Sequence, residues 1–441
     1  MALFCYSIHI MSGKLKYYQF VLGCQMNKSD SERIAGVLND LDYQQVDNET
    51  DVDLIIVVAC SVRQSAIDRI YGKLRQWNKI KKQRPLVTAI TGCLLPGDKK
   101  KMKTLFDLSF DITELAELPK LLQKKSSQLF DVKEYFDLHP TPESAFQIYI
   151  PIMTGCNNFC TYCAVPYVRG REKSRTSRSI IIEVKEYIDK GYKEITLLGQ
   201  NVNSYGLDLP NELTFPELLK EINDLPGDWW LRFVTSHPKD MSDELIDILA
   251  TEKHLCEYVH LPIQAGDNET LASMNRKYTV EHYTSLVEKI REKIPKKTSL
   301  STDIIVGFPG ETPKQFKNTV KVFKSLKFDM AYISKFSPRA GTVAANLADN
   351  ISPHEKKKRE KKLTKVLDKY AVKFNKQYIG QTLTVLIEKS VKKDNHFELS
   401  GKTRSFKTTR CNSQKDLKGQ FVNIKIAKAT AYGLEGVIDG N

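Results

Sequence analysis

The strongest constraint on the fold is a regular alternation of short apolar runs and amphipathic stretches between residues 148 and 343. Each apolar run is followed by a polar loop, and apolar residues at helical spacing lie between the runs. This alternation is typical of a parallel sheet with helices between its strands. The predicted strands are 148–153, 194–198, 231–235, 258–261, 299–306 and 330–336, and the predicted helices are 178–190, 241–253, 268–275, 279–293 and 313–326. The alternation predicts an α/β fold with a partial (β/α)6 barrel.

The loop after the first predicted strand carries three thiols, Cys156, Cys160 and Cys163, in the order C-x3-C-x2-C. In a barrel of this kind, the loops at the carboxyl ends of the strands carry the chemistry. Three thiolates leave one position open on a tetrahedral ion or on a cubane cluster. Structural zinc prefers four protein ligands, and the nearest upstream histidine is His139. The spacing therefore predicts a metal centre with an open coordination position.

Polar residues also follow the other predicted barrel strands. Because these loops share one end of the barrel, we expect their side chains to face the same cavity as the three thiols. The residues are Gly199, Gln200, Asn201, His260, Gln264, and the segment from Gly307 to Glu311. A basic run, RGREKSR, contains Arg169, Arg171, Lys173 and Arg175. It is either a solvated face or a contact for RNA phosphate or a cofactor carboxylate.

The amino-terminal third contains three further strand–loop–helix units, with strands at 17–22, 53–59 and 86–91. Helices are expected from Ser29 or Asp30 and from about residue 61 to 79. Each unit places one cysteine, Cys24, Cys60 or Cys93, at the carboxyl end of its strand. A single free cysteine is often just a small buried residue. Three at equivalent positions of a parallel sheet predict a shared metal site.

The carboxyl-terminal region is basic and rich in short predicted strands. A Lys-rich helix is expected at 354–377, followed by strands at 382–388, 397–399, 403–406 and 421–427. This pattern predicts a small all-β barrel. Residues 376–441 contain 12 Lys/Arg and 6 Asp/Glu, and the whole chain has a net charge of +14. Such an excess favours a nucleic acid partner over a basic module without a ligand.

Within this region, Phe406 lies among three cations, Arg404, Lys407 and Arg410. An aromatic ring among cations suits the stacking of a base and the binding of phosphates. These four residues are therefore predicted to contact RNA.

Nine cysteines, without a recognisable secretory signal, predict a reducing cytoplasmic environment. No run of eighteen apolar residues is present, so no membrane span is expected. Residues 1–15 are interpreted as an amino-terminal extension, with Met11 as an alternative start. Residues 97–140 are expected to connect two domains. Cys5, Cys256 and Cys411 belong to no pattern.

The cysteine spacing after a first barrel strand resembles the radical S-adenosylmethionine superfamily, and the second set of three cysteines resembles its methylthiotransferases. Within these, the motifs closely resemble the tRNA-2-methylthio-isopentenyladenosine synthases. The motifs are GCQMNKSDSE, VVACSVRQSA, TGCLLP, GCNNFCTYCAVPYVRGREKSR, LLGQNVNSYG, HLPIQAGDNETLASMNR and TDIIVGFPGET. The resemblance implies a methylthiotransferase amino-terminal domain at 16–133, a radical S-adenosylmethionine domain at 142–372 and an RNA-binding TRAM domain at 376–440.

The resemblance also implies two [4Fe–4S] clusters. Cys156, Cys160 and Cys163 would hold the cluster that cleaves S-adenosylmethionine to a 5′-deoxyadenosyl radical, and Cys24, Cys60 and Cys93 would hold a cluster that delivers sulfur. Two S-adenosylmethionine molecules are expected per turnover, one of them as methyl donor, together with a flavodoxin-like electron donor. Binding of S-adenosylmethionine is expected to involve Gly199, Gln200, Asn201, Gln264, Gly307 and Glu311. Phe159 and Tyr162 are expected to screen the cluster from water.

The expected substrate is isopentenyl-adenosine beside the anticodon of tRNA, modified at C2. Two alternatives stay open among the methylthiotransferases, while a non-catalytic RNA-binding protein with structural metal is disfavoured by the two open three-cysteine sites. One relative acts on threonylcarbamoyl-adenosine in tRNA, and another acts on an aspartate of a ribosomal protein. The basic tail argues against the ribosomal protein, since that target is itself basic.

Overall fold

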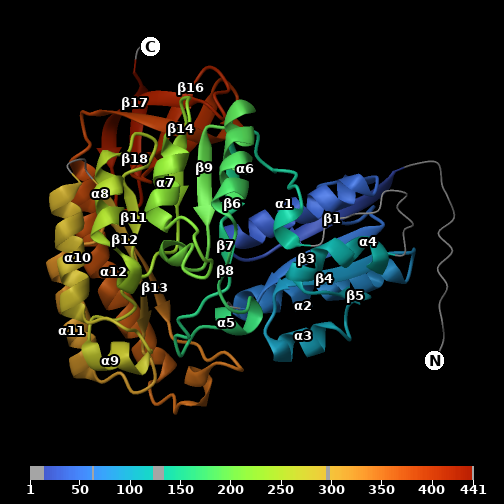
Figure 1. The fold of residues 1–441 in the computed structure, drawn as a ribbon, viewed down its shortest axis with the longest axis horizontal. Helices are drawn as coiled ribbons and strands as arrows, with labels where there is room; N and C mark the ends of the chain where they lie inside the picture. The colour runs from blue at the N-terminus through green and yellow to red at the C-terminus, as the bar shows by residue number, and fades with distance from the viewer. Residues whose placement is uncertain (1–13, 62–63, 123–133, 295–297, 440–441) are drawn as a thin grey trace. The chain divides into compact units, whose positions relative to one another are not determined.

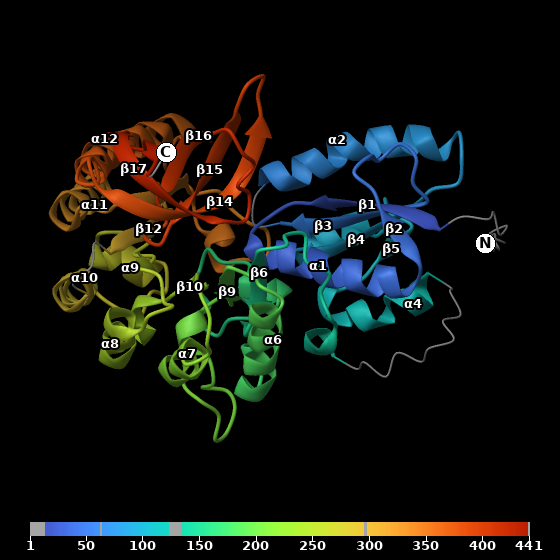
Figure 2. The same ribbon diagram turned by 90° about the horizontal axis from the view of Figure 1, so that it is seen from above.

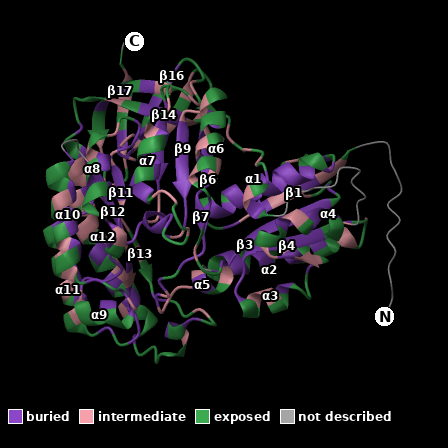
Figure 3. Ribbon diagram, viewed as in Figure 1, coloured by how far each residue is buried: buried purple, intermediate pink, exposed green. Residues whose placement is uncertain are grey.

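The structure is a computed structural model that describes residues 14–61, 64–122, 134–294 and 298–439. The chain forms two compact units, Met1–Glu143 and Ser144–Asn441 (Figure 1). Figure 3 shows that buried residues concentrate in the central strands of each unit. The expected α/β class, with a central partial barrel and a carboxyl-terminal β-barrel, is confirmed.

The amino-terminal unit contains a five-stranded parallel sheet in the order β2-β1-β3-β4-β5. Its strands are β1 (Leu15–Val21), β2 (Tyr43–Gln45), β3 (Leu54–Cys60), β4 (Val87–Cys93) and β5 (Leu108–Ser109). The three predicted strands correspond to β1, β3 and β4, while the short β2 and β5 were not predicted.

Helices pack on both faces of this sheet, α1 (Gln25–Asp40) on one face and α2 (Gln64–Lys81) on the other (Figure 2). Alternate residues of β3 explain the arrangement, because strand side chains point to opposite faces in turn. Ile56 packs in one cluster with Ile34 of α1, and Ile55 packs in another with Ile70 of α2. Burial on both faces accounts for the unbroken apolar sequence of β3.

The predicted start of α1 at Ser29 or Asp30 is wrong, since the helix begins at Gln25 with Cys24 as its N-cap. Gly23 adopts φ +136, which turns the chain directly from strand to helix. Ser29 and Asp30 are fully buried within the helix. Asp30 accepts a hydrogen bond of 2.6 Å from the hydroxyl of Tyr135. These two polar residues therefore satisfy internal contacts and do not cap the helix.

The prediction that residues 97–140 form a connection is also wrong. This part of the chain includes α3 (Pro96–Met102), the 3-10 helix η1 (Ile112–Glu117), α4 (Leu118–Leu121) and η2 (Tyr135–Asp137). Leu115 and Leu118 are fully buried and pack in the same cluster as the α1 side chains. The segment therefore completes the core of the amino-terminal unit, which ends at Glu143.

The carboxyl-terminal unit contains six parallel strands, as predicted, in two three-stranded sheets of order β10-β9-β6 and β11-β12-β13. Hydrogen bonds from Leu231 to His254 and from Cys256 to Leu231 continue the first sheet toward the second. The strands are β6 (Gln147–Pro151), β9 (Glu194–Leu198), β10 (Trp230–Phe233), β11 (Tyr258–His260), β12 (Ser299–Val306) and β13 (Met330–Lys335).

The predicted helices between these strands are present. They are α6 (Ser177–Asp189), α8 (Asp243–Thr251), α9 (Asn268–Ser273), α10 (Val280–Lys293) and α11 (Pro313–Leu326). Unpredicted helices α5 (Val165–Val168) and α7 (Phe215–Asn223) add to them, as do two short strands, β7 (Met153–Thr154) and β8 (Lys173–Ser174). α12 (Pro353–Lys376) matches the expected Lys-rich helix.

The last strands close into a small barrel in the order β14-β15-β16-β18-β17, as the sequence predicted. They are β14 (Thr382–Lys392), β15 (Phe397–Thr403), β16 (Thr408–Ser413), β17 (Phe421–Ala429) and β18 (Leu434–Ile438). β16 and β18 were not predicted. The strand predicted at 403–406 is mostly a turn between β15 and β16, in which Phe406 adopts φ +63.

None of the helices in the described ranges combines the length and apolar character that crossing a membrane requires.

Candidate metal centres and cofactor site

The cysteine loop, residues 155–163, follows β7 and is held close to the chain at residues 170–171. Gly155 adopts φ +80, and a Cβ there would lie 1.9 Å from the carbonyl oxygen of Arg171. Only glycine permits this approach. The Cys156 amide donates to the Gly170 carbonyl at 3.1 Å, and the Cys163 amide donates to the Cys160 carbonyl at 2.9 Å. The loop is therefore fixed by its own backbone on one side.

A second segment, residues 273–276 at the end of α9, holds the opposite side of the cysteine loop. Thr161 donates from its amide to Met274 O at 3.1 Å and from its hydroxyl to Ser273 O at 3.0 Å. The Asn275 side-chain amide donates to the carbonyls of Asn158 and Phe159 at 3.2 and 2.9 Å. Asn275 has φ +55, a conformation that asparagine tolerates at helix ends. We call residues 273–276 the clamp segment.

The thiols of the cysteine loop have polar donors close by. Cys156 Sγ accepts from the side-chain amide of Asn158 at 3.4 Å, and Cys160 Sγ accepts from Nη1 of Arg276 at 3.2 Å. Burial raises the pKa of Cys156 and raises the pKa of Cys163 to about 12. Thiolate ligands must lose these protons, so a metal centre held by these thiols would release protons on binding and would bind more weakly at low pH.

Two aromatic residues of the loop, Phe159 and Tyr162, were predicted to screen the cluster from water, and that role stays a prediction. Phe159, at φ +47, has the Arg171 guanidinium 4.3 Å from its ring centroid and the Tyr167 ring edge-on at 6.1 Å. Tyr162 packs against the main core of this unit. Arg171 of the basic run therefore contacts the cysteine loop itself.

The loops after β9 and β10 present buried acceptors. Gln200 Oε1 and Asn201 Oδ1 are buried without a hydrogen-bond partner among the described residues, as is the hydroxyl of Ser236. Asn201 is oriented by its amide nitrogen, which donates to Asp240 Oδ2 at 2.8 Å. Buried polar atoms without partners are rare in folded proteins. These two amide oxygens can accept hydrogen bonds from an ammonium group, such as that of a bound amino acid moiety.

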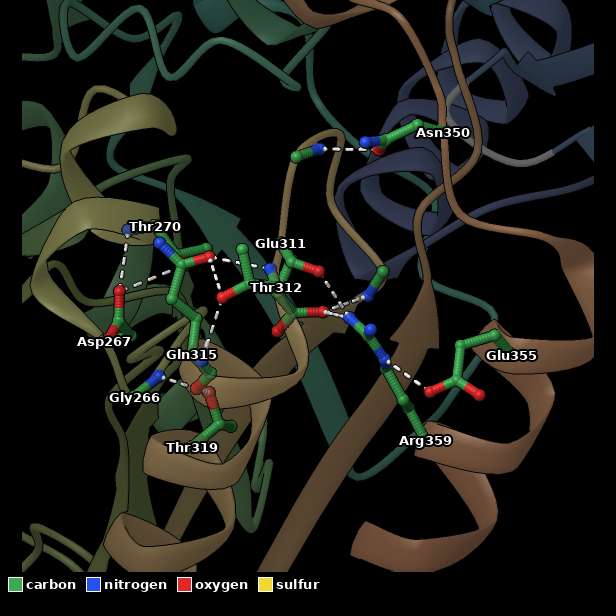
Figure 4. Close-up of polar contacts among 12 residues, drawn as sticks. Gly266, Asp267, Thr270, Glu311, Thr312, Gln315, Thr319, Asn350, Glu355 and Arg359 are labelled. Carbon is green, nitrogen blue, oxygen red and sulfur yellow. Dashed lines mark hydrogen bonds and ion pairs between the residues drawn. The ribbon is translucent and has the colours of Figure 1, made fainter.

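The segment after β12, predicted to contact the cofactor, is held by polar contacts within this unit (Figure 4). Glu311 Oε2 accepts from the Gly307 amide and from Nη1 of Arg359, both at 2.7 Å, and both charged side chains are buried. Asn350 accepts from the Gly310 amide at 3.1 Å. This part of the predicted cofactor set therefore joins the β12 loop to α12, and the Glu311 carboxylate is already in use.

Gln264, also predicted at the cofactor site, adopts φ +68 and is buried. Its amide donates to Asp303 O at 2.9 Å, which forms a bridge to β12. His260 Nδ1 lies 2.8 Å from the Ser301 hydroxyl, and its Nε2 lies 3.5 Å from Asp303.

In the amino-terminal unit, the three predicted thiols lie at the carboxyl ends of adjacent strands. Cys60 and Cys93 are register partners at the ends of β3 and β4, and Cys24 follows β1. Asn27 lies among them. Its amide nitrogen donates to Leu22 O at 3.1 Å and Ala59 O at 2.8 Å. Its Oδ1 lies 3.6 Å from Cys24 Sγ and 3.8 Å from Cys93 Sγ, so both thiols lie close to the same oxygen atom.

Within the described ranges, no three His, Cys, Asp or Glu side chains are arranged so that they could hold a metal ion. Each set of three cysteines is nevertheless gathered locally, one set on a single loop and the other at one sheet edge.

Comparison with known proteins agrees with this division. Residues 150–323 match the radical SAM superfamily, and residues 16–111 match the family described as "Uncharacterized protein family UPF0004". The chain is 41% identical to the tRNA-2-methylthio-N(6)-dimethylallyladenosine synthase of Carboxydothermus hydrogenoformans, over 96% of this chain and 99% of the relative. It is 42% identical to the enzyme of the same name from Clostridium botulinum, strain Langeland, covering 94% and 95%. The chain belongs to the tRNA-2-methylthio-N(6)-dimethylallyladenosine synthase family.

A solved structure supports the fold of this synthase. The radical S-adenosylmethionine methyltransferase TsrM from Kitasatospora setae, with cobalamin and a [4Fe–4S] cluster bound, aligns with a TM-score of 0.56 at 15% identity. The alignment covers 75% of this chain and 77% of that chain, and at this identity it indicates shared architecture alone. Membership of the radical SAM superfamily implies a [4Fe–4S] cluster and S-adenosylmethionine as cofactors.

Three of the four residues predicted to contact RNA have internal partners in this synthase. Arg404 Nε pairs with Glu257 at 3.0 Å, and Lys407 pairs with Asp329 at 2.7 Å, with side chains only 8% and 10% exposed. The Phe406 ring stacks on Tyr258 with centroids 4.5 Å apart. Arg410 is exposed. The first three attach the small β-barrel to the amino ends of the barrel strands, and RNA contact by any of the four stays a prediction.

The synthase site also contains residues that the sequence analysis missed, above all Asn27 and Arg276. Asn27 stands three positions after Cys24, and Arg276 ends the motif that begins at His260. Its closeness to Cys24 in the sequence could have identified Asn27 as a site residue. Only membership of the motif could have identified Arg276, because its sulfur partner, Cys160, is 116 residues away.

Proposed function

We propose that the chain catalyses methylthiolation at C2 of isopentenyl-modified adenosine beside the anticodon of tRNA. The observation that carries the proposal is the pair of three-cysteine sets, one on the cysteine loop and one at the edge of the amino-terminal sheet, in a member of this synthase family. Radical generation and sulfur delivery each need a cluster with an open iron, and three protein ligands leave that position free.

Cys156, Cys160 and Cys163 would hold the radical cluster. Together with S-adenosylmethionine, that cluster supplies the one-electron chemistry needed to remove hydrogen from an unactivated aromatic carbon. The clamp segment and the backbone at residues 170–171 hold the cysteine loop in place, and Phe159 would screen the cluster from water. The amide oxygens of Gln200 and Asn201 would accept hydrogen bonds from the cofactor amino group.

The backbones of Gly199 and Gly307 support this binding site. A Cβ on Gly199 would lie 2.7 Å from the Met153 side chain, and Gly307 adopts φ +69 with Lys356 packed against it. Gln264 would also contact the cofactor, as the sequence predicts. Glu311 would contribute indirectly, by holding the Gly307 amide in place.

Cys24, Cys60 and Cys93 would hold the auxiliary cluster that carries the sulfur, and a second S-adenosylmethionine would donate the methyl group. The partners are tRNA and a flavodoxin-like reductant, and the reducing cytoplasm is the proposed location. The basic surface of the carboxyl-terminal barrel, including Arg410, would contribute to RNA binding by phosphate contacts.

The test is anaerobic reconstitution followed by nucleoside mass spectrometry. Protein supplied with iron, sulfide, S-adenosylmethionine and reductant should convert an isopentenylated anticodon stem–loop to its methylthio derivative. The same RNA carrying threonylcarbamoyl-adenosine should stay unchanged. Modification of the second RNA alone would contradict the proposed substrate.

Cysteine variants test the division of labour. Cys160→Ala should abolish formation of 5′-deoxyadenosine, whereas Cys60→Ala should retain it and lose the methylthio product. Iron analysis should give about two [4Fe–4S] clusters per chain in the parent. Intact methylthiolation by the Cys60 variant would rule out the sulfur-delivering role of the amino-terminal set.

A further inference from the structure

Arg276, in the clamp segment, is a buried cation that contacts one of the cysteine thiols. The residue is 8% exposed, and its Nη1 donates to Cys160 Sγ at 3.2 Å. The rest of the guanidinium is fixed by neutral oxygens: Nε donates to the Tyr278 hydroxyl at 2.9 Å and Nη2 donates to Pro262 O at 3.2 Å. The planar group is therefore held in one orientation, with one edge toward the sulfur.

Tyr278 is itself anchored. Its hydroxyl lies 3.1 Å from Pro262 O and 2.9 Å from Ile263 O, at the turn that follows β11. The Arg276 guanidinium also lies over the Tyr278 ring, 5.0 Å from its centroid. Arg276 thus connects the cysteine loop to the β11 turn through one hydrogen bond from each of its three nitrogens.

No carboxylate in the described part of the chain forms an ion pair with Arg276. A buried cation without a counterion is costly, and proteins rarely retain one. The thiols of the cysteine loop become anions only when they bind a metal centre. The Arg276 guanidinium would therefore gain an anionic partner, the Cys160 thiolate, when the loop binds a metal centre.

We propose that Arg276 is a positioning residue that raises the reduction potential of the cluster on Cys156, Cys160 and Cys163 by donating a hydrogen bond to the Cys160 sulfur. The inference rests on the proposed ligation of that cluster. Reduction adds one negative charge to the cluster, so a fixed cation beside a ligand sulfur stabilises the reduced form more than the oxidised form. Hydrogen bonds to the sulfurs are among the means by which proteins set such potentials.

The experiment is a redox titration followed by electron paramagnetic resonance in a full-length chain with Cys24, Cys60 and Cys93 replaced by alanine. In this background only the cluster of the cysteine loop contributes to the signal. In Arg276→Gln, the ratio of reduced to oxidised cluster at a fixed potential should fall at least tenfold, which is about 59 mV for one electron. Arg276→Lys keeps the charge and should recover part of this loss.

Asn275→Gly is the matched control. It removes a neighbouring donor to the loop backbone that does not touch sulfur, and glycine keeps the positive φ without strain. This variant should change iron retention more than potential. An unchanged potential in iron-loaded Arg276→Gln would overturn the inference.

If Arg276→Gln retains no iron, Arg276→Lys and Tyr278→Phe decide, since each keeps a cation but loses part of the hydrogen-bond geometry. Both should shift the potential downward, and a parental potential in both would overturn the inference. Absence of iron in the background chain itself would instead contradict the proposed ligation by Cys156, Cys160 and Cys163, and the inference with it.

Discussion

Among single residues, Asn27 links two strand ends of the amino-terminal unit to the thiols beside them. Its fully buried side chain donates to one carbonyl just after β1 and to another within β3. Its oxygen lies close to two of the three thiols. Losing such buried hydrogen bonds costs about 1–3 kcal/mol. Asn27 therefore fixes the relative positions of the strand ends that carry Cys24, Cys60 and Cys93.

We predict that Asn27→Ala lowers iron retention at the amino-terminal site. The measurement is iron per chain after anaerobic reconstitution, in a chain with Cys156, Cys160 and Cys163 replaced by alanine. We expect a loss of at least half of the iron. Asn39→Ala is the control, because Asn39 lies on the same helix, is exposed, and bonds only Thr141 among the described side chains. Equal iron in both variants would argue against the positioning role of Asn27.

Glu32 gives the amino-terminal unit a dependence on pH. It is buried in α1, one oxygen accepts from the Glu143 amide, and the other has no partner among the described residues. Burial raises the pKa of Glu32 from 4.5 to about 7, despite nearby Arg33 and Lys28. The native state thus keeps a proton that the unfolded state releases, so stability falls as pH rises from 4.5 to about 7.

Glu32→Gln should remove this loss. We expect the variant to be about 2 kcal/mol more stable than the parent near pH 8, and no more stable than the parent near pH 4. Hydrogen exchange of the α1 amides at the two pH values measures the difference. A stabilisation that is the same at both values would show that the Glu32 proton is not its cause.

The six cysteines could be picked out from the sequence because each follows a strand, and strand ends are readable from apolar runs. Asn27 and Arg276 could not be assigned roles, since their contacts with Cys93 and Cys160 span 66 and 116 residues. Only packing brings such pairs together. Glu311 had a sequence context that suggested cofactor contact, but the carboxylate is occupied by Arg359, which lies 48 residues later.

Among the helices and strands, two helical glycines, one on each face of the amino-terminal sheet, are expected to have opposite effects on stability when replaced by alanine. A Cβ on Gly36 of α1 would lie 2.1 Å from the His139 carbonyl oxygen, whereas a Cβ on Gly72 of α2 would meet nothing within 4 Å. Alanine in an open helical position stabilises by about 1 kcal/mol relative to glycine. Gly72→Ala should therefore stabilise the unit, and Gly36→Ala should destabilise it by about 1–3 kcal/mol through displacement of the 138–141 segment. Denaturant unfolding of the two variants measures both signs.

Element boundaries were predictable where periodicity alone sets them. The six central strands, β6 and β9 to β13, and the helix α11 follow the predicted ranges closely. The start of α1 was missed because buried partners, not capping, occupy Ser29 and Asp30. Similarly, the turn at 403–406 reads as a strand in sequence, but it is shaped by its contact with Tyr258.

In the whole carboxyl-terminal unit, the small β-barrel covers the amino ends of the central strands. Its contacts reach Gln147 at the start of β6, Trp230 at the start of β10 and Tyr258 at the start of β11. Arg232 adds a buried anchor, donating to the carbonyls of Thr403 and Arg404 at 2.8 Å. The sequence predicted both barrels but not their attachment, which depends on a few single contacts.

The buried pair Lys407–Asp329 gives a test of this attachment. Lys407→Met leaves a buried carboxylate unpaired and should cost about 3–5 kcal/mol. Adding Asp329→Asn removes that charge and should recover more than half of the loss. Thermal or urea unfolding of the single and double variants checks this expectation. Breaking the exposed pair Lys289–Asp243 should leave the stability nearly unchanged, and an equal cost at both pairs would contradict the argument.

The attachment of the small β-barrel has a consequence for substrate length. The cysteine loop lies beyond the carboxyl ends of the same strands whose amino ends the small barrel covers. Five residues of β9 alone rise about 16 Å at roughly 3.3 Å per residue. An RNA held by the small barrel, as proposed, would have to run along the side of the unit before it could present a base to the cysteines. A nucleic acid shorter than that path could contact the small barrel or the cysteine loop but not both. The length of the RNA would then help to select the substrate, in addition to the identity of the base.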